Sequence, residues 1–526
     1  MKRRSFLKSI PYAVLPSVVG GYSIQAFGSN PFLEALSAAY TDTDKVLVLV
    51  QLSGGNDGLN MILPLDQYSG MSVVRSNILI PENKTLVLPD NPNTALHPAM
   101  TGLFDLYKDG KVNVVQGVSY PKPDFSHFRA TDIWMSASDS KQYLTTGWAG
   151  RYLMNEFPNF PTGYPNATMP DPLAIQIGGS VSSIFQGVAT SMGMAVQNTS
   201  NTYTAISALQ DPAPNDYYGK EITHTRTVMY QTQKFYAAVK AASDKITIQG
   251  TYPNSSLSNQ LKIVARLIAG GLKTRIYMVS MGGFDTHSIQ VNPNDTTIGA
   301  HANLLGSLSQ GIKAFMDDCK GLTIDDRVIG MTFSEFGRRI KSNASGGTDH
   351  GSAAPVIMFG NGIKGGVTGT NPTITATMTS NDNIPMQYDF RSLYSSIMEN
   401  WFCLPSDEVD GVLLKNFQRL PLINNICSRN ENVANEYKKA GIEIVSNYPN
   451  PFTDRTTIKY TTEGGYTLLQ IFNNQGVLIK TLVNEMAQTA GTFEISCDLE
   501  GLPTGIYYAR FENDINQQVR MLSKVQ

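Results

Sequence analysis

Acidic and imidazole side chains follow an apolar run at residues 328–333. The β-branched and apolar composition of the run predicts a buried parallel strand. After it come Glu335 and His350, which are metal-ligand types, and Arg338, which could hold an anion beside them. Open α/β sheets bind ligands at the carboxyl ends of their strands, so these residues are placed where a site is expected. The alternative is a strand end with a solvated group of charges.

Carboxylates follow other apolar runs in the same way. Asp57 comes after residues 46–52 in a glycine-rich turn, where it is either a metal ligand or an aspartate bonded to its own backbone. Asp285 and His287 come after residues 274–281. Residues two apart in an extended segment point the same way, so this pair could bind one ion.

The histidines are concentrated after predicted strands. Four of the six have this placement: His127, His287, His301 and His350. His301 also opens a predicted helix. A single histidine is usually an ordinary polar residue, so it is the clustering that favours a metal site.

A serine stands at the expected start of a helix after the strand predicted at 112–118. Ser126 is well placed for activation, because the free N–H groups and the dipole of a helix start stabilise an adjacent anion. The alternative is a plain helix N-cap. Arg129, one turn further along, could face the same anion, and His127 is either a supporting donor or simply exposed.

The predicted strands and helices that must position these residues indicate an α/β domain at about 40–423. Helical spacing is found at 97–110, 224–243 and 257–268 between the predicted strands. A region rich in Pro, Asn and Gly at about 156–217 is expected to be an insertion that shapes a pocket. Residues 424–441 are polar and charged, which indicates a linker.

The composition of the chain limits the kinds of partner that it can bind. The chain has 526 residues, with Lys+Arg 41 against Asp+Glu 43, so no nucleic-acid partner held by bulk charge is expected. The four cysteines lack C-x-x-C spacing, which argues against a zinc knuckle and a dense disulfide framework. One disulfide is possible, and its pairing is left open.

The first 28 residues resemble a twin-arginine signal peptide. Arg3 and Arg4 precede a weakly apolar run that ends near small residues at 26–29. The alternatives are an ordinary secretory signal and a retained anchor, but Pro11 and Pro16 interrupt the run. The resemblance implies export of a folded protein through the twin-arginine (Tat) machinery into the periplasm.

The last 85 residues, 442–526, are predicted to form a small β-sandwich of short alternating strands separated by turns. A carbohydrate-binding module would have this pattern. The opening Asn-Tyr-Pro-Asn-Pro-Phe at 447–452 and Leu-Pro-Thr-Gly-Ile-Tyr at 502–507, however, resemble the type A sorting domain of the type IX secretion system. That resemblance implies passage through the secretion machinery to the cell surface or the extracellular space.

The main domain resembles a family of exported proteins, domain of unknown function 1501, placed in the alkaline phosphatase and sulfatase superfamily. The motifs are Gly-Gly-Asn-Asp-Gly at 54–58, Ser-His-Phe-Arg at 126–129, Gly-Gly-Phe-Asp-Thr-His at 282–287, Ser-Glu-Phe-Gly-Arg at 334–338 and Gly-Thr-Asp-His-Gly at 347–351. The resemblance implies an alkaline phosphatase-like, mostly parallel sheet sandwiched by helices, which binds one or two divalent cations (Zn, Mn, Mg or Ca).

The resemblance also implies roles for individual residues. The metal ligands would be Asp57, Asp285, His287, His301, Glu335 and His350. Ser126 occupies the nucleophile position, with Arg129 beside it, and Asn56, His127 and Arg338 would contact the substrate. Phe336 stands where the superfamily has a histidine ligand, so one metal site is incomplete.

Two functions follow from this pattern. The first is a secreted metal-dependent hydrolase of phosphate or sulfate esters, on a polysaccharide or a lipid, that uses a serine nucleophile. The second is a non-catalytic surface protein of the same fold that binds anionic glycans, which the phenylalanine at 336 favours.

Overall fold

The structure is a computed structural model. It describes residues 18–19, 22–23, 44–157, 160–161, 163–188, 190–199, 213–214, 217–248, 250–424, 427, 443–462, 464–473, 478–513 and 517–525. The chain divides into two compact units, Met1–Tyr40 and Thr41–Gln526. In the first unit, β1 (Val18–Val19) and β2 (Tyr22–Ser23) pair antiparallel. The rest of the expected signal peptide lies outside the described residues.

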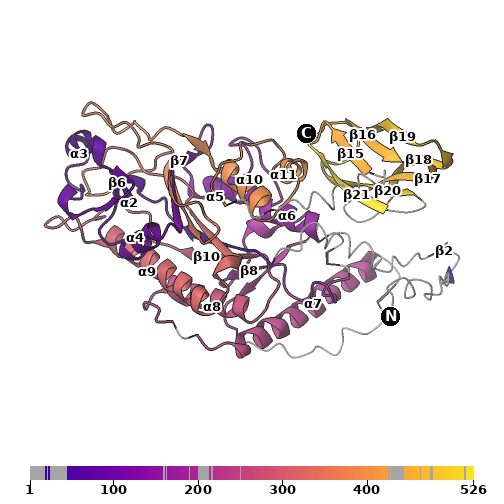
Figure 1. Cartoon of the computed structure of the whole chain (residues 1–526), viewed down its shortest axis with the longest axis horizontal. Coiled ribbons are helices and arrows are strands. Elements are labelled where there is room, and N and C mark those ends of the chain that lie inside the picture. The colour runs from indigo at the N-terminus through magenta and orange to yellow at the C-terminus, as the bar shows by residue number, and fades with distance from the viewer. Residues whose placement is uncertain are drawn as a thin grey trace. The chain divides into compact units, whose positions relative to one another are not determined.

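A nine-stranded sheet forms the centre of the second unit (Figure 1). Its order is β13-β7-β12-β11-β3-β10-β8-β9, and β14 pairs with β7. The strands are β3 (Val46–Leu52), β7 (Val112–Ser119), β8 (Ala174–Ile177), β9 (Gly193–Val196), β10 (Ile276–Met281), β11 (Val328–Phe333), β12 (Ala354–Gly360), β13 (Gly366–Thr368) and β14 (Tyr388–Asp389). Only the β12 pairings are antiparallel in this sheet. The sheet is mostly parallel, as predicted.

Strand β3 is buried on both of its faces. Its residues Val46, Val48 and Val50 belong to one hydrophobic cluster, whereas Leu47 and Leu49 belong to another. Successive side chains of a strand point to opposite faces, so a strand that is covered on both faces needs apolar residues at every position. The predicted run at 46–52 therefore becomes a central strand.

Helices supply the covering on both faces. Those whose apolar residues join the cluster of Val48 are α4 (Thr101–Lys108), α7 (Tyr217–Lys245), α8 (Ser256–Ala269) and α9 (Ala300–Gly321). Those that join the cluster of Leu47 are α5 (His127–Ser136), α6 (Trp148–Glu156), α10 (Phe390–Asn400) and α11 (Ser406–Leu413). The helices lie on opposite sides of the sheet, which confirms the predicted fold class (Figure 1).

Shorter elements complete the main domain. They are α2 (Gly58–Met61), α3 (Tyr68–Val74), the small antiparallel sheet of β4 (Ile62–Pro64), β5 (Leu86–Leu88) and β6 (Asn91–Leu96), and 3-10 helices at Leu65–Gln67, Glu82–Lys84, Ser183–Phe185 and Asp325–Arg327. The region expected as an insertion at 156–217 contains β8 and β9, which extend one edge of the large sheet. Its remaining described residues connect these two strands to α6 and α7.

The tail forms two antiparallel sheets around one hydrophobic cluster. One sheet holds β15 (Glu443–Tyr448), β16 (Arg455–Thr462) and β19 (Gly491–Asp498), and the other holds β17 (Gly465–Asn473), β18 (Leu478–Gln488), β20 (Gly505–Asn513) and β21 (Gln517–Lys524). Ile458 from the first sheet and Leu469 and Phe511 from the second share the core. This confirms the predicted β-sandwich, with β15 and β21 as strands that the sequence patterns did not indicate.

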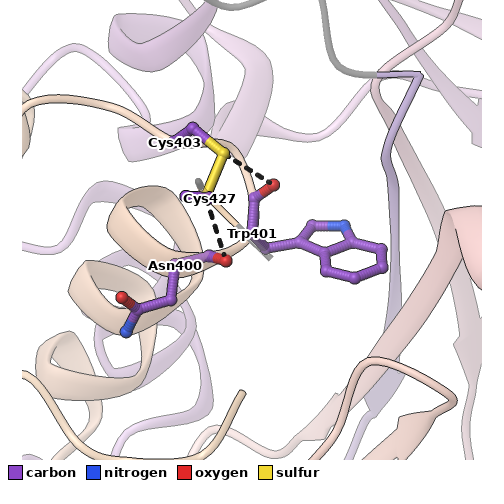
Figure 2. The surroundings of a disulfide bond; sticks show 4 residues. All are labelled: Asn400, Trp401, Cys403 and Cys427. Carbon is purple, nitrogen blue, oxygen red and sulfur yellow. Dashed lines mark hydrogen bonds between the residues drawn. A yellow bond between two sulfur atoms is a disulfide. The ribbon is translucent and has the colours of Figure 1, made fainter. Parts of the chain in front are cut away.

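A disulfide joins Cys403 to Cys427 (Figure 2). Cys403 lies just after α10, beside Trp401, whose buried indole donates a hydrogen bond to the carbonyl of Val46 at the start of β3 (3.1 Å). The bond therefore fixes the segment that leaves the domain to a helix end that is itself tied to the central strand. Cys319 and Cys497 are buried and unpaired.

Among the described helices, none is both long enough and apolar enough to cross a bilayer.

Removal of the disulfide should destabilise the main domain. Closing the 24-residue separation between Cys403 and Cys427 restricts the unfolded chain, and this effect is worth about 3 kcal/mol. We expect Cys403→Ser/Cys427→Ser to lower the free energy of unfolding by that amount in a denaturant titration. A reductant should lower the stability of the wild type and leave that of the double variant unchanged. Equal stability of the two proteins would contradict this role.

Candidate metal centre

Four loops meet at the carboxyl ends of the parallel strands. They follow β3, β7, β10 and β11, and a fifth segment, which carries His350, leads into β12. The approach is close: a Cβ on Gly54, whose φ is +127°, would lie 2.3 Å from the backbone nitrogen of Asp285. Only glycine fits this position without strain. The glycines that the sequence shows after β3 therefore allow two loops, distant in the chain, to touch.

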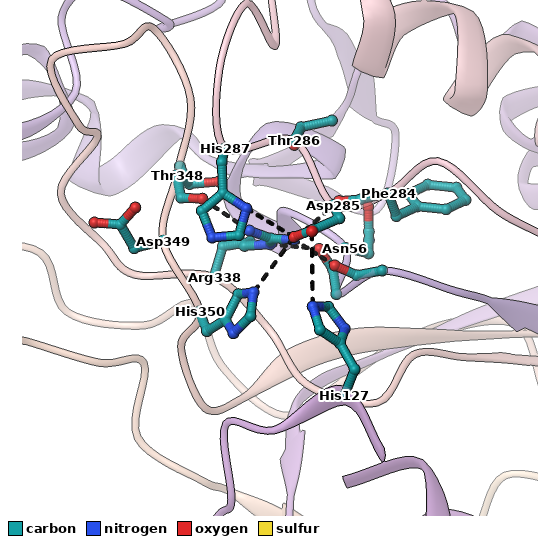
Figure 3. Close-up of polar contacts among 12 residues, drawn as sticks. Asn56, His127, Phe284, Asp285, Thr286, His287, Arg338, Thr348, Asp349 and His350 are labelled. Carbon is teal, nitrogen blue, oxygen red and sulfur yellow. Dashed lines mark hydrogen bonds and ion pairs between the residues drawn. The ribbon is translucent and has the colours of Figure 1, made fainter. Parts of the chain in front are cut away.

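His127, Asp285 and His350 form a compact cluster in this place (Figure 3). One ligand atom from each lies within 4.8 Å of the others. Nε2 of His127 lies 3.7 Å from Oδ2 of Asp285, and Nε2 of His350 lies 3.3 Å from Oδ1 of the same carboxylate. His287 adjoins the cluster, with Nδ1 2.8 Å from Oδ1 of Asp285.

The other nitrogen of each imidazole is held by an oxygen. Nδ1 of His350 donates to the carbonyl of Phe125 (2.9 Å), which can only accept. Nδ1 of His127 lies 2.9 Å from Oε1 of Glu335, and this oxygen also accepts the backbone N–H of Gly54 (2.7 Å). Each ring is therefore held through Nδ1 and turns its Nε2 toward Asp285. Metal-binding histidines are commonly oriented in this way by carboxylates and carbonyls.

The charges of the cluster suit a cation. Burial lowers the pKa of His350 below 6.5, and nearby Arg338 adds to this, against opposing bonds to Phe125 and Asp285. Partial burial raises the pKa of Asp285, but the bond from Arg338 and the neighbouring histidines outweigh it and hold the pKa below 3.8. A neutral imidazole beside an ionised carboxylate is the state that binds metal.

The spacing of the donor atoms also fits. A tetrahedral site with bonds of about 2.0–2.1 Å places its ligand atoms about 3.3 Å apart. Nε2 of His350 lies at this spacing from Oδ1 of Asp285 (3.3 Å), Nε2 of His127 lies 3.7 Å from Oδ2, and the three ligand atoms stay within 4.8 Å of one another. His127, Asp285 and His350 could therefore hold one divalent ion, with His287 at its edge.

Glu335 and Arg338 stand behind the cluster. Glu335 is buried and orients His127, as described. Arg338 is also buried, and its guanidinium donates to the carbonyls of Gly54, Gly55 (2.6 Å), Phe284 (3.2 Å) and Thr348 (2.8 Å) and to Oδ1 of Asp285 (2.6 Å). Arg338 thus fastens the loops together and lies beneath the site.

Ser126 and Arg129, which were expected to act together, have different surroundings in the structure. Ser126 is the exposed N-cap residue of α5, next to His127, and its hydroxyl does not cap the helix. Arg129 is buried and turns to the loop at residues 138–142, where it pairs with Asp132 and donates to the carbonyl of Asp139 (3.1 Å). The structure therefore leaves Ser126 exposed, directly before His127 in the chain, and engages Arg129 in local contacts.

Asp57, Asn56 and His301 form a second, fully buried group. Asp57 pairs with Arg75, whose Nη2 lies 2.6 Å from Oδ2, and accepts a bond from Gln290 (2.6 Å). Nε2 of His301 lies 2.9 Å from Oδ1 of Asn56. The predicted ligands thus divide between an accessible cluster and an internal one, with Glu335 supporting the first.

Phe336, which stands where the superfamily has a histidine, packs against the rings of His127 (centroids 4.9 Å apart) and His350 (4.4 Å). Two further residues that shape the site were not singled out in the sequence. Arg75 and Gln290 surround Asp57. Neither lies next to a predicted strand end or in a recognisable motif, so only the tertiary structure reveals their roles.

Two family models match the sequence. One describes a protein of unknown function (DUF1501) and covers residues 107–413, more than half of the chain. The other describes a secretion system C-terminal sorting domain and covers residues 446–524. The second match confirms the resemblance of the tail and indicates export to the cell surface or the extracellular space. No protein of curated function matches the sequence.

Several solved structures resemble the chain weakly. A protein in the alkaline phosphatase superfamily from Vibrio parahaemolyticus is 10% identical, with 92% of this chain and 82% of that one covered and a TM-score of 0.32. The PsFucS1 sulfatase from Pseudoalteromonas sp. is 10% identical, with 89% and 88% covered and a TM-score of 0.30. The lipoteichoic acid synthase LtaP from Listeria monocytogenes is 10% identical, with 66% and 75% covered and a TM-score of 0.28. Similarity at this level assigns neither substrate nor mechanism.

The buried His301 should make stability depend on pH. Burial lowers its pKa to about 4, with Arg75 and Arg338 adding to the effect and Asp57 opposing it. The unfolded chain takes up this proton near pH 6.5 and the folded chain only near pH 4, so stability is complete above pH 6.5 and falls between these values by about 3 kcal/mol.

We expect His301→Gln to reduce the slope of unfolding free energy against pH between 6.5 and 4. Some slope should remain, because burial also lowers the pKa of His97, to about 3. Identical slopes for wild type and His301→Gln in denaturant titrations at several pH values would contradict the assignment.

Proposed function

This chain belongs to the DUF1501 family, and from that premise and the geometry of the site we propose that it is an exported, metal-dependent hydrolase of phosphate or sulfate esters. The observation that carries the proposal is the orientation of His127 and His350. Each has its Nδ1 bonded to an oxygen and its Nε2 turned to Asp285. Two imidazoles that present Nε2 to one carboxylate have the arrangement expected for ligands of a shared ion.

The donor set favours particular ions. Two imidazoles and one carboxylate suit Zn or Mn better than Ca or Mg, which prefer oxygen ligands. When bound, such an ion would withdraw charge from the ester as a Lewis acid. Glu335 would hold the His127 ring in place, and Arg338 would hold Asp285. The surroundings of the ion are thus set by hydrogen bonds that are already present.

Ser126 is the proposed nucleophile. It is exposed, it begins helix α5, and its hydroxyl is not used to cap the helix. Its Oγ would attack phosphorus or sulfur, its proton would pass to the surrounding water, and the bond to the alcohol of the ester would break. The N-terminus of α5 would favour the negative charge of the transferred group. Water would then release that group as the free anion.

A non-catalytic protein that binds anionic glycans is the second candidate. Phe336 favours it, because its ring fills the space beside His127 and His350 where the superfamily pattern has a histidine. Under this alternative, glycan binding would survive Ser126→Ala, and neither protein would turn over an ester. The two functions are therefore separated by one substitution.

Ser126→Ala should abolish hydrolysis and leave the metal in place. We expect turnover of an aryl phosphate or aryl sulfate to fall on the order of 1,000-fold or more, because the covalent step is lost. Metal content, measured by elemental analysis, should not change. Ser72→Ala, at an exposed serine of α3, is the matched control and should keep full activity. Full activity of Ser126→Ala would exclude the serine mechanism.

Glu335→Gln should weaken metal binding without removing a direct ligand. Loss of the carboxylate that orients His127 is expected to reduce affinity about 10- to 100-fold, as for other supporting partners of metal-bound histidines. Competition with a chromogenic chelator would measure this affinity. Asp105→Asn, at an exposed carboxylate of α4, provides the control and should bind as the wild type does. Unchanged affinity in Glu335→Gln would argue against the centre.

A further inference from the structure

Asp57 lies in a fully buried group of polar residues that we call the Asp57 cluster: Asn56, Asp57, Arg75, Gln290 and His301. The family resemblance implies that Asp57 is a metal ligand. In the structure, Arg75 Nη2 lies 2.6 Å from Oδ2 of Asp57, and both side chains are at most 1% exposed. The positive charge that neutralises this carboxylate is therefore supplied by the chain.

Arg75 differs from other buried arginines in what it binds. Arg338 donates to four backbone carbonyls as well as to Asp285, and Arg151 donates only to oxygens of residues without negative charge, among them the carbonyls of Val412 (2.6 Å) and Ser136 (2.8 Å). In the described part of the chain, the Arg75 guanidinium bonds only to Asp57, and its Nε and Nη1 have no partner. Arg75 thus contributes its charge and does not fasten loops.

The neighbours of Asp57 present the wrong polarity for a metal ion. The Gln290 side-chain oxygen accepts from the hydroxyls of Thr286 (2.9 Å) and Thr348 (3.1 Å), so its NH₂ group faces Asp57. The side-chain oxygen of Asn56 is engaged by His301 (2.9 Å). The groups bonded to Asp57 are thus a guanidinium and an NH₂ donor, which do not fit a second cation, and Nδ1 of His301 in the same cluster has no partner among the described residues.

We propose that Arg75 is the permanent cation of the Asp57 cluster and that this cluster takes no metal. The chain then needs one divalent ion, at His127, Asp285 and His350; this last statement rests on the proposed function. A covalently attached cation cannot be removed by a chelator, so the Asp57 cluster should stay intact when the accessible site is stripped.

The test uses metal counting and thermal unfolding of the full chain. In Arg75→Ala the buried carboxylate loses its partner and space opens beside it, so Zn or Mn should bind there and raise the melting temperature by several degrees. Arg151→Ala is the matched control: it removes another fully buried arginine that has no carboxylate partner, so the same ions should not restore its stability.

A second variant tests the proposal even if Arg75→Ala does not fold. Asp57→Asn/Arg75→Met removes both charges together, and replacing a buried ion pair with neutral groups of similar size is often tolerated. We expect the wild type and this double variant each to carry one ion per chain, and Asp285→Asn to lose it.

The outcomes separate the two proposals. Two ions in the wild type, one of them lost in Asp57→Asn/Arg75→Met, would overturn the role of Arg75. Failure of Zn and Mn to bind or stabilise Arg75→Ala would overturn it as well. No ion in the wild type together with metal rescue of Arg75→Ala would support the role of Arg75 and refute the accessible metal centre.

Discussion

The site depends on the buried guanidinium of Arg338. Its hydrogen bonds reach the loop after β3 at Gly54 and Gly55, the loop after β10 at Phe284 and Asp285, and the segment before β12 at Thr348. Leaving a buried charge unpaired costs several kcal/mol, so the bonds of Arg338 favour the arrangement in which these loops meet. Their meeting brings Asp285 to the histidines.

Much of the framework was predictable from the sequence. Continuous apolar runs indicated β3, β7, β10 and β11, because strands buried on both faces leave little ambiguity. Strand β21 was missed, since its sequence, Gln517–Lys524, is largely polar. Its place is set by pairing with β20, which is a long-range contact that periodicity does not reveal.

The site was predictable only in part, for a physical reason. Residue type and position after a strand identify side chains that reach one edge of the sheet, and His127, Asp285 and His350 do meet there. Residue type and position do not show which carboxylate is already neutralised by another side chain. Asp57 lies at the same edge, but its charge is neutralised by Arg75, the C-cap residue of α3. Similarly, Glu335 bonds to His127 and so becomes a support for a ligand.

The accessible cluster and the Asp57 cluster thus differ in exposure to solvent. The side chain of Asp285 is 46% exposed and can exchange its partners, whereas Asp57 is enclosed with an arginine. This arrangement combines one accessible centre, open to an ion and a substrate, with an internal charge pair that belongs to the fold.

Anomalous diffraction from crystals of the full chain grown with Zn or Mn would test the account most directly. We predict one strong peak per chain, within bonding distance of Nε2 of His127, Nε2 of His350 and a carboxylate oxygen of Asp285, and no peak beside Asp57. A peak at Asp57, or none among His127, Asp285 and His350, would contradict it.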